Sequence, residues 1–221
     1  MRRLKLLLPA LVTLPLVVLA AGCGGSSSPS STQTDAAGCV PMQQPAGAAR
    51  TAPKPTTTLD PAKTYDVTLE TNCGSFTFRL DPNESPHATA AFVELVQRGY
   101  FDDTTFHRIV PGFVIQGGDP SGTGSGGPGF TTIDTPPANA KYTHGVVAMA
   151  KTSLQPRGAA GSQFFVVTTA NAGLPPDYAI IGKVTEGLDV VDHIGTFGTP
   201  GDEAGTPTEV VVVEKATVAE S

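Results

Sequence analysis

The sequence lacks the residue patterns on which several common kinds of catalysis depend. Its four histidines are not spaced as metal ligands, and its glycine-rich segment 117–129 lacks the Gly-Lys-Ser/Thr of a phosphate-binding loop. Ser162 is not flanked by the glycines of a nucleophile elbow, so hydrolysis through this serine is not supported. We therefore expect neither a metal ion nor a cofactor.

Basic residues are scarce. The 221-residue chain has 14 Lys and Arg against 20 Asp and Glu, a net charge of −6. Removal of residues 1–22, which hold three basic residues and no acidic ones, would make the net charge −9. Nucleic-acid binding requires a basic surface that can face phosphates. We therefore exclude nucleic acid as a partner.

The first 22 residues have the pattern of a secretory signal. Met1–Lys5 is basic, and the apolar run over residues 6–21 is short for a membrane-spanning helix of about 20 residues. The run ends in Leu19-Ala20-Ala21-Gly22-Cys23, which resembles a bacterial lipoprotein signal cleaved before a lipid-modified cysteine. We expect an exported protein, anchored by lipid on Cys23 to the cell membrane and facing its extracytoplasmic side. The alternative is ordinary secretion with a free Cys23.

Residues 23–63 are rich in Gly, Ser, Thr, Pro, Ala and Gln and have almost no large apolar residues. Such a segment cannot bury enough surface to offset the ordering of its backbone, so we expect a flexible tether. If Cys23 carries lipid, Cys39 and Cys73 remain as an even pair in an oxidising compartment, and we expect them to form a disulfide. Two free thiols are the alternative.

Residues 64–219 have the periodicities of one β-rich domain. Apolar residues alternate over 65–69 and 76–80, which predicts a hairpin, and Ser85 is the expected N-cap of a helix that ends at Gly99. Further strands are predicted at 105–109, 114–116, 145–150, 163–168, 178–184 and 209–218, and a short helix at 188–194. About eight strands and two helices, without regular strand–helix alternation, favour an antiparallel sheet closed or nearly closed on itself.

One arginine lies within the apolar stretch 106–120. Arg108 is followed by apolar and aromatic residues, then by Gln116 and a Gly-Gly-Asp-Pro turn. A guanidinium is a fixed set of donors that keeps its proton and is seldom buried without a partner. Beside Phe113 and Val114 it could hold a neutral carbonyl or amide against an apolar wall, which indicates peptide binding. The alternative for Arg108 is a salt bridge to a surface carboxylate.

Three motifs resemble those of the cyclophilins, the peptidyl-prolyl cis-trans isomerases. Residues 106–119 resemble the family signature, Gly161–Phe165 the second motif and Ile181–Val184 the third, in the same order and spacing. The resemblance covers residues 64–219. It implies the family fold, a mainly β, closed eight-stranded antiparallel barrel with two capping α-helices, and isomerase activity without a cofactor.

The resemblance also implies roles for individual residues. Arg108 corresponds to the catalytic arginine of the family. The implied substrate-binding residues are Phe113, Val114, Gln116, Ala150, Lys151, Thr152, Gln163, Phe165, Leu174 and Tyr178. Three positions depart from the family pattern, because Gly173 stands near the place of a tryptophan, Tyr178 replaces a histidine and Val114 replaces a methionine.

The implied reaction needs little catalytic apparatus. Rotation about an X–Pro amide makes and breaks no bond, so the enzyme need only bind the twisted amide more tightly than the planar forms. We expect a monomer that acts on proline-containing polypeptides and aids the folding of exported proteins. The alternative is a lipoprotein that binds proline-containing segments without catalysis, because site geometry rather than fold decides function.

Overall fold

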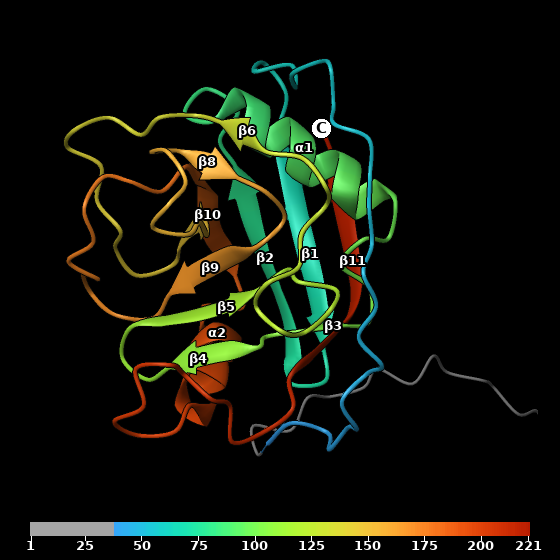
Figure 1. The fold of residues 1–221 in the computed structure, drawn as a ribbon, viewed down its shortest axis with the longest axis vertical. Helices are drawn as coiled ribbons and strands as arrows, with labels where there is room; N and C mark the ends of the chain where they lie inside the picture. Colours follow the sequence, from blue (N-terminus) through green and yellow to red (C-terminus); the bar gives the residue numbers. More distant parts are fainter. Residues whose placement is uncertain (1–37) are drawn as a thin grey trace, which may run out of the picture. The chain divides into compact units, whose positions relative to one another are not determined.

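The computed structural model describes residues 38–221, and its main antiparallel sheet is strongly curled (Figure 1). Six phenylalanine rings fill the inside of this sheet. Each of these side chains is at most 1% exposed: Phe76, Phe78, Phe92, Phe101, Phe106 and Phe164. Phe92 packs edge to face on Phe78 and Phe164, with ring centroids 5.6 and 5.4 Å apart. The alternation of residues 76–80 predicts that Phe76 and Phe78 face the core, and the structure confirms it.

Nine strands form the main sheet, in the order β3-β11-β1-β2-β10-β7-β9-β5-β4. Their bounds are β1 Tyr65–Thr71, β2 Gly74–Leu80, β3 Thr104–Thr105, β4 Arg108–Val110, β5 Val114–Gly117, β7 Val146–Met149, β9 Phe164–Val167, β10 Ile180–Glu186 and β11 Val212–Glu220. The predicted hairpin is the antiparallel pair β1 and β2. Two further strands, β6 (Thr132–Ile133) and β8 (Ala159–Ala160), pair with each other. They escape prediction because two residues carry no periodicity.

The structure does not show the closed eight-stranded barrel that the sequence predicts. Strands β3 and β4 are the two edges of the sheet, and no ladder joins them within residues 38–221. They are consecutive in the chain, so Phe106 and His107 cross the gap covalently. Each strand is two or three residues long and pairs with a different neighbour, β11 or β5, which leaves too little backbone for a closing ladder.

Both predicted helices are present, but the first is capped differently from the prediction. They are α1 (Pro86–Gln97) and α2 (Leu188–Ile194), the latter followed by a 3₁₀ turn, η1 (Gly195–Phe197). Ser85 occupies the N-cap position of α1 without a capping side-chain hydrogen bond. Instead, the Asp134 carboxylate accepts a hydrogen bond from the backbone N–H of Ala88 at 2.6 Å. A carboxylate at this end of a helix stabilises its unpaired N–H groups.

Residues 38–63, which we call the strap, form no helix or strand but lie along the domain past β11 and the end of α1 (Figure 1, blue to cyan). The backbone N–H of Val40 donates to the Asn72 carbonyl, and Arg50 donates to carbonyls of the turn after α1. The prediction of a flexible tether does not fit this part of the chain. Its polar groups find partners on the folded domain, which composition cannot anticipate.

Cys39 and Cys73 form the predicted disulfide, which joins the start of the strap to the β1–β2 turn. The predicted signal peptide 1–22, the lipidation site Cys23 and the first part of the predicted tether lie outside the described residues. Within residues 38–221, no helix is long and apolar enough to cross a membrane.

Candidate active site

Alternation along the central strands creates an apolar cluster separate from the main core. Phe164 in β9 points into the core, so its neighbour Phe165 points to the other face of the sheet. In β5, Ile115 likewise faces the core while Val114 joins Phe165. Successive side chains of a strand lie on opposite faces, which brings residues predicted to line the proline pocket to one side.

A cavity of about 230 Å³ opens on this apolar cluster. Nine predicted site residues line it: Arg108, Phe113, Val114, Gln116, Ala150, Lys151, Phe165, Leu174 and Tyr178. They come from β4, β5, β9, the turn between β4 and β5, and the segments that follow β7 and β9. The fold therefore brings together residues that are up to 70 positions apart in the chain.

Arg108 forms one edge of this cavity and keeps donors free. It lies opposite Gln116 in the β4–β5 ladder, with its guanidinium carbon 6.0 Å from the centre of the Phe113 ring. Its Nη2 donates to the backbone carbonyl of Glu203 at 3.1 Å. Within the described part of the chain it forms no ion pair, so the alternative of a surface salt bridge is not what the structure shows.

The far wall of the cavity is the half-buried ring of Tyr178. This ring packs edge to face on Phe165, with centroids 5.4 Å apart. The backbone of Tyr178 is held by the buried Tyr142 hydroxyl, which donates to its carbonyl at 2.8 Å and accepts from its N–H at 2.9 Å. Burial raises the pKa of Tyr142 above its usual value, so the hydroxyl keeps its proton. Gly173, in contrast, is exposed and supplies no wall.

Lys151 lies between the cavity and a second, larger one. Its side chain is only 6% exposed, and its ammonium lies 3.3 Å from the Asp177 carboxylate and 5.5 Å from the centre of the Tyr178 ring. It also lies 3.4 Å from the carbonyls of Thr152 and Gln155. The ammonium thus links Asp177 to the segment that follows Lys151 and stabilises the wall between the cavities. The sequence did not indicate this role.

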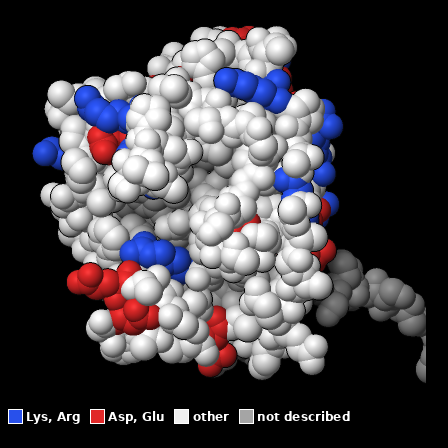
Figure 2. Space-filling model, in the orientation of Figure 1, with Lys and Arg blue, Asp and Glu red and all other residues white. Residues whose placement is uncertain are grey.

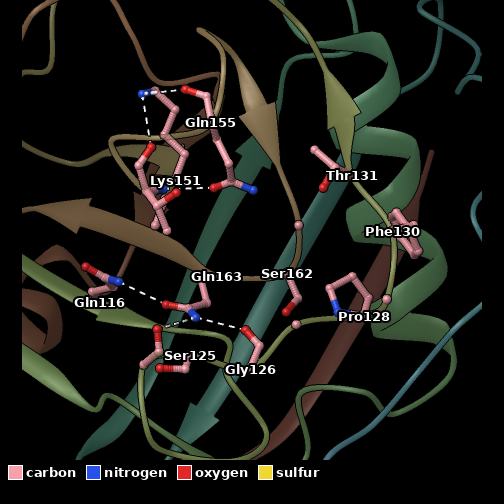
Figure 3. A pocket seen from close by; sticks show the side chains of 16 residues that line it. Gln116, Ser125, Gly126, Pro128, Phe130, Thr131, Lys151, Gln155, Ser162 and Gln163 are labelled. Atoms are coloured by element: carbon pink, nitrogen blue, oxygen red, sulfur yellow. Dashed lines mark hydrogen bonds between the residues drawn. The ribbon is translucent and has the colours of Figure 1, made fainter.

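The larger cavity has a volume of about 740 Å³ and shares Gln116, Ala150 and Lys151 with the smaller one. Thr152 and Gln163 line this cavity and not the small one. Figure 3 shows the side chains of Gln116 and Gln163 pointing toward each other, and Gln116 Nε2 donates to Gln163 Oε1 at 3.0 Å. Gln163 Nε2 also donates to the carbonyls of Gly124 and Gly126, both at 2.9 Å.

Sequence reasoning missed most of the wall of the larger cavity. The missed residues are Gly124–Thr131, Gln155, Gly161 and Ser162. Residues 124–129 of the first set belong to the glycine-rich segment 117–129, to which the sequence analysis assigned no site. The sequence contained one signal that the backbone is tightly packed here, the pair Gly117-Gly118 directly after Gln116. In the structure φ at Gly118 is +84°, and a side chain there would collide with the Ser162 backbone, so this position requires glycine.

A sequence model of the family "Cyclophilin type peptidyl-prolyl cis-trans isomerase/CLD" matches residues 66–218. This match covers more than half of the chain and includes every strand that lines the two cavities. The chain belongs to the cyclophilin-type peptidyl-prolyl cis-trans isomerases.

Other cyclophilins are similar over the same region. Peptidyl-prolyl cis-trans isomerase-like 1 of Neurospora crassa is 39% identical over 157 residues, which cover 69% of this chain and 93% of the relative. Peptidyl-prolyl cis-trans isomerase CYP18-2 of Arabidopsis thaliana is 36% identical over 157 residues, with the same shares covered.

Solved cyclophilin structures have the same fold. A crystal structure of a cyclophilin type peptidyl-prolyl cis-trans isomerase from Cryptosporidium parvum matches with a TM-score of 0.63 and 30% identity, covering 71% of this chain and 98% of the other. A second crystal structure of that enzyme, in the presence of the dipeptide Ala-Pro, matches with a TM-score of 0.62 and 31% identity, covering 70% and 98%.

The face of this cyclophilin drawn in Figure 2 has few charged groups at its centre, and most Lys, Arg, Asp and Glu lie toward its margins. His107, next to Arg108, is half-buried, and its Nδ1 has no hydrogen-bond partner among the described residues. Burial lowers the pKa of His107 below its usual value, an effect that Asp119 partly opposes. The imidazole is therefore neutral near pH 7, which leaves Arg108 as the cation at this edge of the small cavity.

Proposed function

We propose that the protein is an exported, lipid-anchored cyclophilin that accelerates rotation about X–Pro bonds of other exported proteins. The observation that carries the isomerase site is the 230 Å³ cavity, in which Arg108 lies at the edge of an apolar pocket walled by Val114, Phe165 and Tyr178. An apolar pocket of this kind suits a proline ring, and the guanidinium at its edge suits a neutral amide.

The physical problem is a torsional barrier. Rotation about an amide bond costs about 18–20 kcal/mol because twisting breaks its conjugation. The twisted form has a pyramidal nitrogen with a localised lone pair, and its carbonyl is no longer conjugated with that nitrogen. A preorganised donor that reaches the nitrogen therefore favours the twisted form over the planar forms. No step requires a nucleophile, a metal ion or a cofactor.

We assign the steps to particular side chains. The proline ring enters the pocket against Phe165, while Gln116 and Gln163 hold the neighbouring backbone. Arg108 donates to the substrate, either to the prolyl nitrogen as it becomes pyramidal or to the proline carbonyl that anchors the ring. Both sites of donation favour the twisted amide. The Glu203 carbonyl and the Phe113 ring help to keep the guanidinium at the cavity edge.

Replacement of Arg108 tests this assignment. In Arg108→Ala, kcat/KM for a proline tetrapeptide should fall about 10²–10³-fold, the usual effect of removing one transition-state donor. Arg108→Lys should recover little, because lysine lacks the planar fork. Arg79→Ala, which removes an exposed arginine paired with Asp66, is the matched control and should keep full activity. Near-normal activity of both Arg108 variants would remove the arginine from the mechanism.

Two features support the cellular part of the proposal. The first is the basic, apolar and cysteine-terminated pattern of residues 1–23, and the second is the Cys39–Cys73 disulfide, which is typical of an oxidising compartment. In bacterial expression, the full chain should fractionate with membranes and Cys23→Ser should not. Equal membrane association of the two would argue against the lipid anchor.

The same assays distinguish the isomerase from a protein that binds proline segments without catalysis. Such a protein would bind the tetrapeptide without turnover. Tyr178 and exposed Gly173, at the wall where the sequence departs from the family, are the positions that favour this second function. Robust turnover by the wild type excludes it.

A further inference from the structure

The strap lies against the outer side of the loop that walls the larger cavity. The strap ends at residue 63, before the region matched by the family model, which begins at residue 66. The loop, residues 119–131, contains eight of the sixteen residues that line the cavity. Neither segment contains regular structure before β6, so each depends on contacts with something else.

Three hydrogen bonds join the two segments. The backbone N–H of Ala48 donates to the carbonyl of Pro120, and that of Ala52 donates to the carbonyl of Pro128, both at 3.0 Å. The ammonium of Lys54 donates to the carbonyl of Thr131 at 2.9 Å. Because Pro128 and Thr131 line the larger cavity, these bonds act on its wall.

The two backbones also approach closely at Gly47. A Cβ atom at this position would collide with the carbonyl group of Ser121. Only glycine lets the strap come this close, so a single added methyl group would push the strap and the loop apart.

Arg50 attaches the strap to a rigid part of the domain. Its Nη1 lies 2.7 Å from the carbonyl oxygens of Tyr100 and Asp102 and 3.4 Å from that of Gly99, in the turn after α1. The Tyr100 hydroxyl lies 3.5 Å from the Arg50 carbonyl oxygen and 3.3 Å from Oγ of Ser162, which lines the larger cavity. Arg50 stands between Ala48 and Ala52, so its anchor holds both strap-to-loop bonds in place.

The loop is thus held from two sides. On the inside, Gln163 donates to Gly124 and Gly126, as Figure 3 shows for Gly126. On the outside, the strap donates to Pro120, Pro128 and Thr131. Within the loop, the buried Asp119 carboxylate also accepts hydrogen bonds from the N–H groups of Ser121 and Gly126. A glycine-rich loop loses much conformational freedom when it is ordered, so each set of partners helps to keep one geometry.

We infer that strap residues 44–54 are a positioning element of the substrate groove, which fixes loop 119–131 for polypeptide segments that flank the proline. This inference rests on the proposed function. The substrate class that needs the strap is an extended polypeptide long enough to pass from the small cavity over Gln116 and Lys151 into the larger one. A tetrapeptide held in the small cavity does not need it, because among the described residues no hydrogen bond or ion pair joins the strap to a residue that lines that cavity.

Two variants disturb the strap without touching either cavity. Gly47→Ala adds a methyl group at the close approach, and Arg50→Ala removes the anchor. Arg50→Lys keeps a charged donor and should rescue part of the effect. Lys63→Ala is the matched control, because its ammonium pairs with Glu220 and not with the loop.

The first measurement is kinetic. For a long unfolded substrate whose refolding is limited by proline isomerisation, Gly47→Ala and Arg50→Ala should raise KM about three- to tenfold with kcat nearly unchanged, the signature of lost uniform binding. For a tetrapeptide, kcat/KM of both variants should stay within about twofold of the wild type. Lys63→Ala should match the wild type on both substrates. Equal losses on the two substrates, or no loss on the long one, would overturn the inference.

The second measurement is amide hydrogen exchange, which does not depend on activity. In Gly47→Ala and Arg50→Ala, the amides of Ser121 and Gly126 should exchange about tenfold faster, because the loop opens locally when its outer partners are lost. Unchanged exchange at Ser121 and Gly126 would show that the strap only covers the loop, and this result would also overturn the inference.

The two measurements also separate this inference from the proposed function. If the wild type turns over neither substrate, the proposed function fails. Affinity for the long proline-containing chain, measured by fluorescence anisotropy, then takes the place of KM. Weaker binding in Arg50→Ala together with faster exchange would still support the strap as a positioning element, and unchanged binding would count against it.

Discussion

The two neighbouring cavities are built in different ways. The small cavity has walls on β4, β5 and β9, where ladder hydrogen bonds set the position of each side chain. The larger cavity is walled mostly by loop residues, which have no ladder and are held by Gln163 on one side and by the strap on the other. The proposed isomerase chemistry thus lies on the strand-built part, and the proposed contacts with longer substrates lie on a loop that is held by remote segments.

The strand-built cavity can be tested by substitutions on the two faces of β9. Phe164→Ala removes a fully buried core ring and should lower the free energy of unfolding by about 3–5 kcal/mol. Phe165→Ala acts on the cavity side of the same strand, so it should cost less stability but a larger share of kcat/KM for a tetrapeptide. Urea unfolding and the isomerase assay measure the two effects. Equal stability losses and equal activity losses would contradict the assignment of the two faces.

The strap, which holds the outer side of the loop-built cavity, is fastened at its start by the Cys39–Cys73 disulfide. Cys39→Ser/Cys73→Ser opens a loop with a sequence separation of 34 and should lower the free energy of unfolding by roughly 3–4 kcal/mol in the chain-entropy model. Turnover of a tetrapeptide should change little, because the loop residues to which the strap donates hydrogen bonds do not line the small cavity. Thermal unfolding with and without reductant provides the measurement. The double variant should not respond to reductant, whereas the wild type should.

His107 lines neither of the two cavities and gives the smallest expected effect. Its pKa is lowered in the folded state, so the unfolded chain binds more protons as the pH falls through about 6.5. Stability from neutral His107 is therefore present above this pH and is lost below it, by at most about 1.4 kcal/mol per pH unit. Comparison of the pH dependence of unfolding in the wild type and His107→Gln measures it. Identical slopes between pH 5 and 7, a window of roughly one unit on either side of the usual histidine pKa, would refute this role.

Much of the small cavity could be predicted because its residues lie in strands and motifs with strong local patterns. Alternation places Val114 and Phe165 on one face and Ile115 and Phe164 on the other, and the family motifs mark Arg108. The burial of the Lys151 side chain in the wall between the two cavities could not be predicted. Its ammonium is held by Asp177 through a contact between segments that carry no shared pattern.

The β-rich domain, the apolar helix face, the half of the site that lies on strands and the even pair of cysteines can all be predicted from the amino-acid sequence. These depend on periodicity and composition, which are local properties. Three features depend on the tertiary structure: β3 and β4 do not pair with each other, Asp134 caps α1, and hydrogen bonds join the strap to loop 119–131. Each of these features depends on which segments, far apart in the chain, form hydrogen bonds with each other. Two stretches that each look flexible alone can become ordered together, because each supplies the partners that the other lacks.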